Sequence, residues 1–150
     1  MKKIRYYIAY GSNLSVGQMA LRCPDAKIVG KATLPDWKLV FRLHATLEPC
    51  EGRAVPVLIW EISEEDERLL DLYEGYPSYY IKRDMDVEMT ELDGSSSRTI
   101  TAMVYLMTDG REARLPSKSY YRVLEEGYRQ FGFDERLLRL ALREAREAAA

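Results

Sequence analysis

Residues 6–14 read Tyr6-Tyr7-Ile8-Ala9-Tyr10-Gly11-Ser12-Asn13-Leu14, a strand pattern that stops at a glycine turn. Aromatic and β-branched residues alternate with others from residue 4 to residue 10, as is typical of a partly buried strand. The next three residues are turn formers, so the strand ends abruptly. Glycine lets a backbone approach a ligand closely, and such a turn can line a small concave site with N–H groups. Taken alone, the pattern favours an ordinary first strand and its turn over a binding site.

Length and composition predict one globular domain spanning residues 1–150. Hydrophobic residues make up 47% of the 150 and charged residues 31%, which is enough to bury a core. The 22 Lys and Arg residues are scattered among 24 Asp and Glu, so no basic surface for nucleic acid is expected. No apolar run reaches the roughly 20 residues that span a bilayer. The start, Met1-Lys2-Lys3, lacks the apolar segment of a secretory signal. We therefore expect a cytoplasmic protein with no membrane or nucleic-acid partner, whose oligomeric state the sequence leaves open.

Histidine and cysteine are too sparse for the common metal sites and nucleophile arrangements. His44 is the one histidine, and neither Cys-x-x-Cys nor His-Glu-x-x-His spacing occurs, so no metal is expected. The glycines are dispersed and form no phosphate-binding loop. His44 is interpreted as a solvated or structural residue on a loop. Cys23 and Cys50 are expected to be free thiols used in packing, although a single disulfide between them stays open.

The order of the expected elements indicates the fold class. Strands are expected at residues 4–10, 26–34, 37–43, 55–62, 79–89 and 99–107, with a turn at Pro35-Asp36 and a loop at residues 44–53. Pro56 suggests that its strand begins there or lies at an edge. Helices are expected from Ser15, from Ser63 to Gly75, from Ser117 or Ser119 to Gly132, and from Asp134, with a tail that frays from residue 143. Because strands and helices do not alternate regularly, we predict an α+β fold with a mostly antiparallel sheet or small β-barrel flanked by helices.

One carboxylate, Glu74, differs from the solvated ones. It lies between Tyr73 and Gly75 at the carboxyl end of an expected helix. The negative end of the helix dipole and partial burial both raise the pKa of a carboxyl group. A carboxyl with a raised pKa can accept a proton and return it near neutral pH. An ordinary surface glutamate at a helix end is the other interpretation of the same pattern.

Three segments, in this order, resemble the γ-glutamylcyclotransferase-like family. They are Tyr10-Gly11-Ser12-Asn13-Leu14, then Leu70-Asp71-Leu72-Tyr73-Glu74-Gly75 with Tyr79-Tyr80 just beyond, then Pro116-Ser117-Lys118-Ser119-Tyr120. Residues 22–24, 34–37 and 57–61 also match family positions. The resemblance covers about residues 5 to 140. It implies a small, mostly antiparallel β-barrel with helices around it, which agrees with the order of elements.

The resemblance also implies an activity and a site. The family cleaves γ-glutamyl amines or amino acids by internal cyclisation, an acyltransferase- or lyase-type step that gives 5-oxoproline and needs no metal or cofactor. Glu74 matches the catalytic glutamate, a general acid and base, and backbone N–H groups from Tyr10 to Asn13 are candidates to bind the oxyanion. The substrate-binding positions implied are Tyr7, Ile8, Ala9, Tyr10, Gly11, Ser12, Asn13, Leu14, Tyr80 and Tyr120. The segment after Glu74 is shorter than in some members, so Tyr79 could replace Tyr80.

Two functions from different classes remain open. The first is a cyclotransferase acting on a small γ-glutamyl substrate through Glu74, with an undetermined leaving group to which the charged loop 109–114 could contribute. The second is a non-catalytic member of the same fold that binds a small amine or a protein. The glutamate occurs together with an intact Tyr10-Gly11-Ser12-Asn13 turn, which favours the enzyme.

Overall fold

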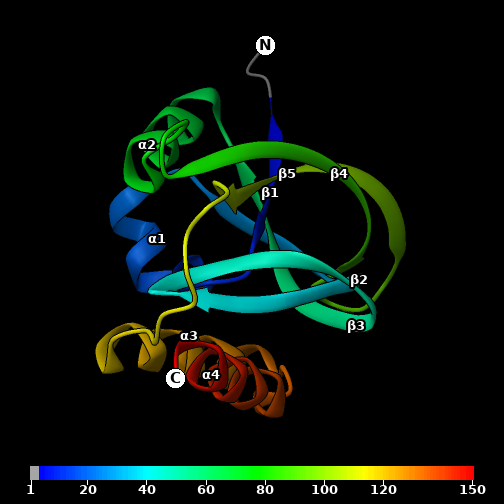
Figure 1. The fold of residues 1–150 in the computed structure, drawn as a ribbon. Coiled ribbons are helices and arrows are strands. Elements are labelled where there is room, and N and C mark those ends of the chain that lie inside the picture. The colour runs from blue at the N-terminus through cyan, green and yellow to red at the C-terminus, as the bar shows by residue number, and fades with distance from the viewer. Residues whose placement is uncertain (1–3) are drawn as a thin grey trace.

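A closed five-stranded barrel forms the centre of the computed structural model, which describes residues 4–150 (Figure 1). Its strands are β1 (Arg5–Ala9), β2 (Lys27–Arg42), β3 (His44–Ile62), β4 (Tyr80–Glu91) and β5 (Ser97–Met107), joined in the order β1-β3-β2-β4-β5. Neighbouring strands are antiparallel except β1 and β5, which run parallel where Tyr7 faces Met103. The predicted α+β barrel is therefore confirmed. The start of the chain, Met1–Lys3, lies outside the described residues.

The turn predicted at Pro35-Asp36 is a bulge inside one long strand. β2 runs without a break from residue 27 to residue 42, and its register against β3 shifts between Pro35 and Trp37. Between these two pairs β2 has one residue, Asp36, and β3 has four, residues 50–53, so the extra residues lie in β3. Asp36 has a φ of 64°, a left-handed conformation that Asp tolerates better than most residues. Pro and Asp are turn residues in isolation, but strand pairing on both sides extends the sheet through them.

The loop predicted at residues 44–53 is wrong for a similar reason. β3 begins at His44, directly after a tight turn at Leu43, whose φ is 69°. Pro49 faces Trp37 within the resulting hairpin. At Pro56 the strand pairs with β2 on one side, while β1 pairs only with residues 58–62 on the other. Pro56 therefore occupies an edge position, where a missing N–H is tolerated.

Four α-helices cover the outside of the barrel: α1 (Val16–Arg22), α2 (Glu64–Glu74), α3 (Lys118–Phe131) and α4 (Glu135–Ala149). A capping box between Ser63 and Asp66 begins α2, and Gly75, with a φ of 68°, ends it. The hydroxyl of Ser117 caps α3, which decides between the two serines proposed for this role. None of the helices within residues 4–150 is long and apolar enough to cross a bilayer.

The carboxyl-terminal segment, where a frayed tail is predicted from residue 143, is helical to Ala149. α4 continues to Ala149, and Ala145 is buried. Glu144 pairs with Arg53 at 3.0 Å and with Lys38 at 3.9 Å, so this part of the helix is held to the β2–β3 hairpin. Its alanines suggested a loose tail, but an amphipathic face packed on a sheet stabilises the helix.

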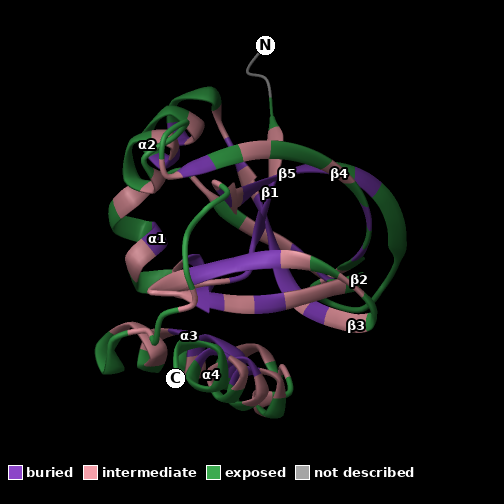
Figure 2. Ribbon diagram, viewed as in Figure 1, coloured by how far each residue is buried: buried purple, intermediate pink, exposed green. Residues whose placement is uncertain are grey.

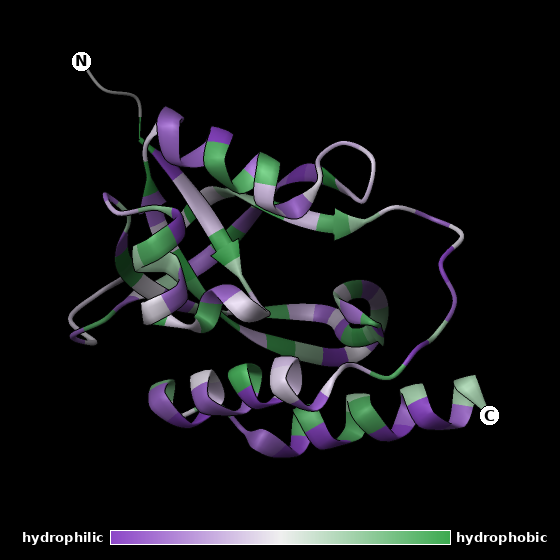
Figure 3. Cartoon of the chain, turned by 90° about the vertical axis from the view of Figure 1, so that its left-hand side faces the viewer, coloured by the Kyte–Doolittle hydropathy of each residue, from purple (hydrophilic) through white to green (hydrophobic). Residues whose placement is uncertain are grey.

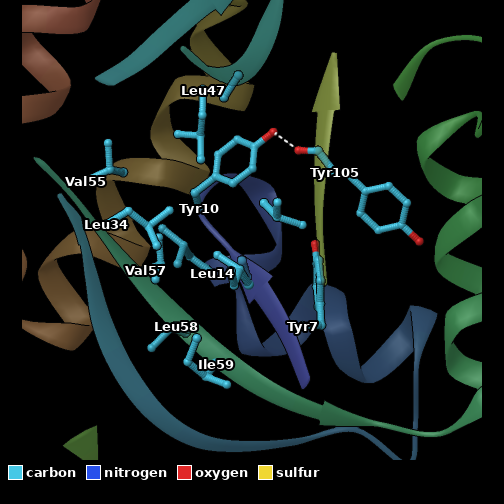
Figure 4. Packing of buried hydrophobic residues seen from close by; sticks show 14 of the residues in the cluster. Tyr7, Tyr10, Leu14, Leu34, Leu47, Val55, Val57, Leu58, Ile59 and Tyr105 are labelled. Carbon is cyan, nitrogen blue, oxygen red and sulfur yellow. Dashed lines mark hydrogen bonds between the residues drawn. The ribbon is translucent and has the colours of Figure 1, made fainter. Parts of the chain in front are cut away.

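The helices lie in two groups on the barrel. α3 and α4 lie next to the β2–β3 hairpin, whereas α1 and α2 lie beside the ends of β1 and β4 (Figure 1). Buried residues run along β1 and β5, and exposed ones gather on the outer faces of the helices (Figure 2). Hydrophobic and hydrophilic residues alternate along α3 and α4, as expected for helices with one face on a core (Figure 3). The core beside β1 combines aliphatic residues such as Leu34, Val57 and Ile59 with tyrosines (Figure 4).

Candidate active site

A cavity of about 410 Å³ opens where β1 ends and α2 ends, within the usual size range of small-molecule sites. It is lined by Tyr7, Tyr10, Gly11, Ser12, Asn13, His44, Ala45, Leu72, Tyr73, Glu74, Gly75, Tyr79, Tyr80, Tyr105 and Tyr120. These residues come from β1, β3, β4, β5, α2 and α3 and from the turns beside them. The fold thus brings together the three segments of sequence that carried the family resemblance.

Glu74 is the last residue of α2 and is half-buried in the cavity wall. Burial raises the pKa of its carboxyl group to about 7, against the opposing charge of Arg22. The helix ends directly after it because Gly75 adopts a left-handed conformation. A carboxyl group with this pKa exchanges a proton near neutral pH, as acid–base catalysis requires.

The turn after β1 presents unused backbone donors. Ser12–Leu14 form one turn of 3₁₀ helix, in which the N–H groups of Leu14 and Ser15 bond back to Gly11 and Ser12. Within residues 4–150, no hydrogen bond occupies the N–H groups of Gly11, Ser12 or Asn13. Three unused donors at the wall of a cavity can bind a negatively charged oxygen.

Asn13 holds this turn in place. Its carbonyl accepts a bond from Trp60 Nε1 at 3.0 Å, and its Nδ2 donates to the Tyr7 hydroxyl at 2.9 Å. At Gly11, an added Cβ would lie 3.3 Å from the hydroxyl of Tyr120 and 3.6 Å from Cβ of Ala45. The position is therefore crowded, and glycine suits it.

The hydroxyl groups of three pocket tyrosines bond to the backbone. Tyr10 donates to the carbonyl of Tyr105 at 2.7 Å (Figure 4), and Tyr80 donates to the carbonyl of Ala45 at 2.7 Å. The Tyr120 hydroxyl accepts the N–H of Ala45 at 3.1 Å. Burial raises the pKa of each of these tyrosines above its usual value, so all stay neutral near pH 7. Because Tyr120 accepts at this position, its own proton is available to a ligand.

His44 lines the cavity but is not among the predicted site residues. It begins β3, and its Nδ1 lies 2.8 Å from the hydroxyl of Tyr79. Its ring also meets that of Tyr120 edge-on at 5.2 Å between centres. Burial lowers the pKa of the imidazole, which favours the neutral form. The predicted loop is a strand end, and His44 is half-buried at the cavity, so of its two interpretations the solvated one is wrong.

Tyr79 and Tyr80 were alternatives for one position in the site, and both line the cavity. Tyr80 is buried, and its hydroxyl donates to the carbonyl of Ala45, whereas Tyr79 is half-buried and its hydroxyl is hydrogen-bonded to His44. The guanidinium of Arg111 lies 4.1 Å above the ring of Tyr79. The charged loop 109–114 therefore reaches the site through Tyr79. Tyr105 is a second pocket residue that was missed, because its strand is apolar on both faces and gives no periodic signal.

Three predicted substrate-binding residues do not line the cavity. Ile8, Ala9 and Leu14 are each fully buried in the hydrophobic core. Strand alternation turns Ile8 to the opposite face from Tyr7. Leu14 packs under α3, against Gly127.

The two cysteines are free thiols, which excludes the disulfide left open by the sequence. Cys23 is buried, and its thiol lies 3.6 Å from the carbonyl of Asp66. Cys50 is half-buried in β3. Neither lines the cavity.

Comparison with known proteins gives the family of this fold and site. The model of the γ-glutamyl cyclotransferase, AIG2-like family matches residues 7–128. The γ-glutamylcyclotransferase of Mus musculus is 32% identical over 142 residues, covering 86% of this chain and 72% of that protein. The Homo sapiens γ-glutamylcyclotransferase is 31% identical over 139 residues, covering 84% and 71%. A solved γ-glutamyl cyclotransferase superposes with a TM-score of 0.76 at 27% identity, covering 93% of this chain and 86% of its own. The chain therefore belongs to the γ-glutamyl cyclotransferase, AIG2-like family.

Proposed function

We propose that this protein cleaves γ-glutamyl compounds by internal cyclisation, releasing 5-oxoproline and a free amine or amino acid. The observation that carries the proposal is the position of Glu74. Its carboxyl group has a pKa raised to about 7 and shares one cavity with the unused donors of the Gly11–Asn13 turn. Names of relatives in the same family support the same reaction.

In the proposed reaction the substrate supplies its own nucleophile. The α-amino nitrogen of the γ-glutamyl unit attacks the γ-carbonyl carbon and forms a C–N bond that closes a five-membered ring. Glu74 removes the proton from that nitrogen. The bond from the carbonyl carbon to the leaving nitrogen then breaks, and Glu74 returns the proton to the leaving amine. The proton is balanced within one turnover, and no water, metal or cofactor takes part.

The turn after β1 supplies the electrostatic part of this mechanism. Negative charge develops on the γ-carbonyl oxygen as the ring closes. In this proposal the N–H groups from Gly11 to Asn13 bind that oxygen, and the Tyr120 hydroxyl, which lies beside Gly11, adds a donor. Tyr7, Tyr10 and Tyr80 form the walls that keep the γ-glutamyl chain curled, since cyclisation gains its rate from a held near-attack geometry.

The leaving group occupies the other part of the cavity, beside His44 and Tyr79. A neutral imidazole, a tyrosine hydroxyl and the Arg111 guanidinium lie together there. These side chains set which amine or amino acid is accepted.

The proposal is tested by incubating the protein with a panel of γ-glutamyl amino acids and γ-glutamyl amines and measuring 5-oxoproline. We expect turnover of at least one compound and a loss of roughly 10²–10⁴-fold in kcat for Glu74→Gln, the usual effect of removing a general acid–base group. Glu64→Gln is a matched control, because Glu64 lies exposed at the other end of α2. Activity that survives Glu74→Gln contradicts the mechanism. Binding of the panel without turnover favours the non-catalytic alternative.

A further inference from the structure

Arg22, the last residue of α1, does not line the cavity. It contacts two segments that do, the turn after β1 and the last turn of α2. Its Nη1 donates to Oδ1 of Asn13 at 2.5 Å, and its Nη2 donates to Oε1 of Gln18 at 2.7 Å. Its Cζ lies 3.6 Å from the ring centre of Tyr73, a distance at which a guanidinium stacks on an aromatic face. One side chain therefore contacts the turn after β1 and the last turn of α2.

The contacts continue from Arg22 into the reacting groups. Asn13, which accepts from Arg22, donates in turn from its Nδ2 to the Tyr7 hydroxyl. On the other side, the Tyr73 hydroxyl lies 3.2 Å from Oγ of Ser12, and the next residue along α2 is Glu74. We call Ser12, Asn13, Arg22 and Tyr73 the Arg22 clamp. It closes a ring of contacts between the oxyanion turn and the helix end that carries the carboxyl group.

The positive charge of Arg22 also acts on the carboxyl group of Glu74. None of the ion pairs formed by residues 4–150 includes Arg22. Its positive charge lowers the pKa of Glu74 and so opposes the effect of burial. The other ionisable groups that line the cavity are His44 and the tyrosines at positions 7, 10, 73, 79, 80, 105 and 120, none of which brings a positive charge near neutral pH.

We propose that Arg22 is a positioning residue, which joins the Gly11–Asn13 turn to the Glu74 end of α2 through Asn13 and Tyr73. The inference rests on the cyclotransferase function proposed above. The clamp fixes the distance between the oxyanion donors and the base, which no single element determines because they come from β1 and α2. Its charge keeps Glu74 ionised over part of the neutral range, so that the carboxylate can accept the substrate's proton.

An arginine suits both roles better than a lysine. The planar guanidinium can donate to Asn13 and Gln18 while its face lies on Tyr73, whereas an ammonium group has no flat face to stack. Arg22→Lys therefore keeps the charge and loses the stacking. Arg22→Met loses both while keeping an unbranched apolar stem. Comparing the two variants separates the geometric effect from the electrostatic one.

The experiment measures kcat and KM across pH for wild type, Arg22→Lys, Arg22→Met and the control Arg68→Met, whose guanidinium lies exposed on α2 and pairs with Glu65. We expect both Arg22 variants to lose roughly tenfold or more in kcat, since small misplacements of reacting groups are costly. We expect the acid limb of kcat/KM to move upward by about one pH unit in Arg22→Met and to stay in place in Arg22→Lys. Wild-type kcat in Arg22→Met, or full recovery in Arg22→Lys, overturns the clamp.

Two further measurements keep the inference testable on its own. Tyr73→Leu removes the ring from under the guanidinium, and we expect the same loss in kcat even if Arg22→Met does not fold. The carboxyl resonance of Glu74, assigned by its absence in Glu74→Gln, is titrated by NMR with ¹³C-labelled glutamate. A higher pKa in Arg22→Met than in wild type supports the electrostatic role even if no substrate is turned over, and an unchanged pKa contradicts it.

Discussion

Leu14 and Gly127 lie so close together that position 127 has room only for hydrogen. A Cβ added to Gly127 would lie 2.6 Å from Cβ of Leu14. This contact presses α3 against the turn after β1, which supplies the proposed oxyanion donors. We therefore expect Gly127→Ala to displace the turn, to lower the free energy of unfolding by about 1–3 kcal/mol as overpacking does, and to reduce kcat. Denaturant unfolding and steady-state kinetics measure the two effects.

Gly17→Ala is the control for this substitution, because the nearest atom to an added Cβ there, Oγ of Ser15, is 4.0 Å away. Gly17 lies in α1, where alanine is favoured over glycine by about 1 kcal/mol at most. We expect a neutral or slightly stabilised protein with unchanged kcat. If Gly127→Ala behaves like Gly17→Ala, the turn does not depend on this contact.

The pH dependence of turnover follows from the raised pKa of Glu74. The proposed base must be ionised in the free enzyme, and its pKa is raised to about 7 by burial. We expect kcat/KM to fall tenfold for each pH unit below about 7, in proportion to the ionised fraction. The measurement is a pH profile with the best γ-glutamyl substrate. An acid limb near pH 4.5, the ordinary value for glutamate, would contradict the raised pKa of Glu74.

The free energy of unfolding should also depend on the ionisation of Glu74, but it should fall as pH rises, whereas kcat/KM rises. Below pH 4.5, Glu74 is protonated in the folded and the unfolded state. Between about 4.5 and 7 the unfolded chain loses that proton while the folded protein keeps it, so stability falls as pH rises. The full shift corresponds to about 3 kcal/mol at most, and less because the side chain is partly exposed. We expect Glu74→Gln to unfold at a higher temperature than wild type at pH 8 and at the same temperature near pH 4.

Tyr79 and Tyr80 should respond differently to loss of the hydroxyl. Tyr80→Phe leaves the buried carbonyl of Ala45 without its donor, so we expect a loss of about 1–3 kcal/mol in stability. Tyr79→Phe removes the bond to His44 in a half-buried position, so we expect little change in stability and a change in KM. Thermal unfolding and kinetics with two different leaving groups test both expectations. Equal effects of the two variants on stability would contradict this division.

The two thiols should differ in reactivity. Cys23 is 1% exposed, and burial raises the pKa of its thiol to about 12, so it is a poor nucleophile. Cys50 is half-buried in β3. We expect a maleimide reagent to label one site under native conditions, identified as Cys50 by peptide mass, and two sites after denaturation. Labelling of Cys23 in the native protein would mean that the α1–α2 region opens readily.

The sequence was most informative where local signals agree with the tertiary structure. Ser63, Asp66 and Gly75 mark the two ends of α2 by capping chemistry, so the position of Glu74 at a helix end could be predicted. The pKa shift could be predicted in direction, since burial dominates it. The barrel followed from the order of elements and from the family resemblance.

Local sequence patterns gave wrong predictions where the conformation of a segment depends on the strand or helix that packs against it. Pro35-Asp36 reads as a turn, yet β3 pairs on both sides of it and makes it a bulge. His44 has no neighbour in sequence that suggests a site. Only the turn at Leu43, which reverses the chain after β2, brings the imidazole to Tyr79. Ile8 and Leu14 belong to a recognisable motif, but strand alternation and helix packing turn their side chains into the core.

The short pairing between β2 and β4, which closes the barrel on one side, has a consequence for the order of folding. These strands meet through only two residue pairs, Gly30 with Glu91 and Lys31 with Thr90, and a Cβ on Gly30 would lie 2.6 Å from the side chain of Met89 and from the carbonyl of Thr90. The partners are far apart in the chain, so joining them loses much more chain entropy than forming either hairpin. We therefore expect barrel closure to come late in folding, after the β2–β3 and β4–β5 hairpins exist. Until then both hairpins have free edges, so a bulkier residue at position 30 should slow refolding and promote aggregation before it affects any chemistry.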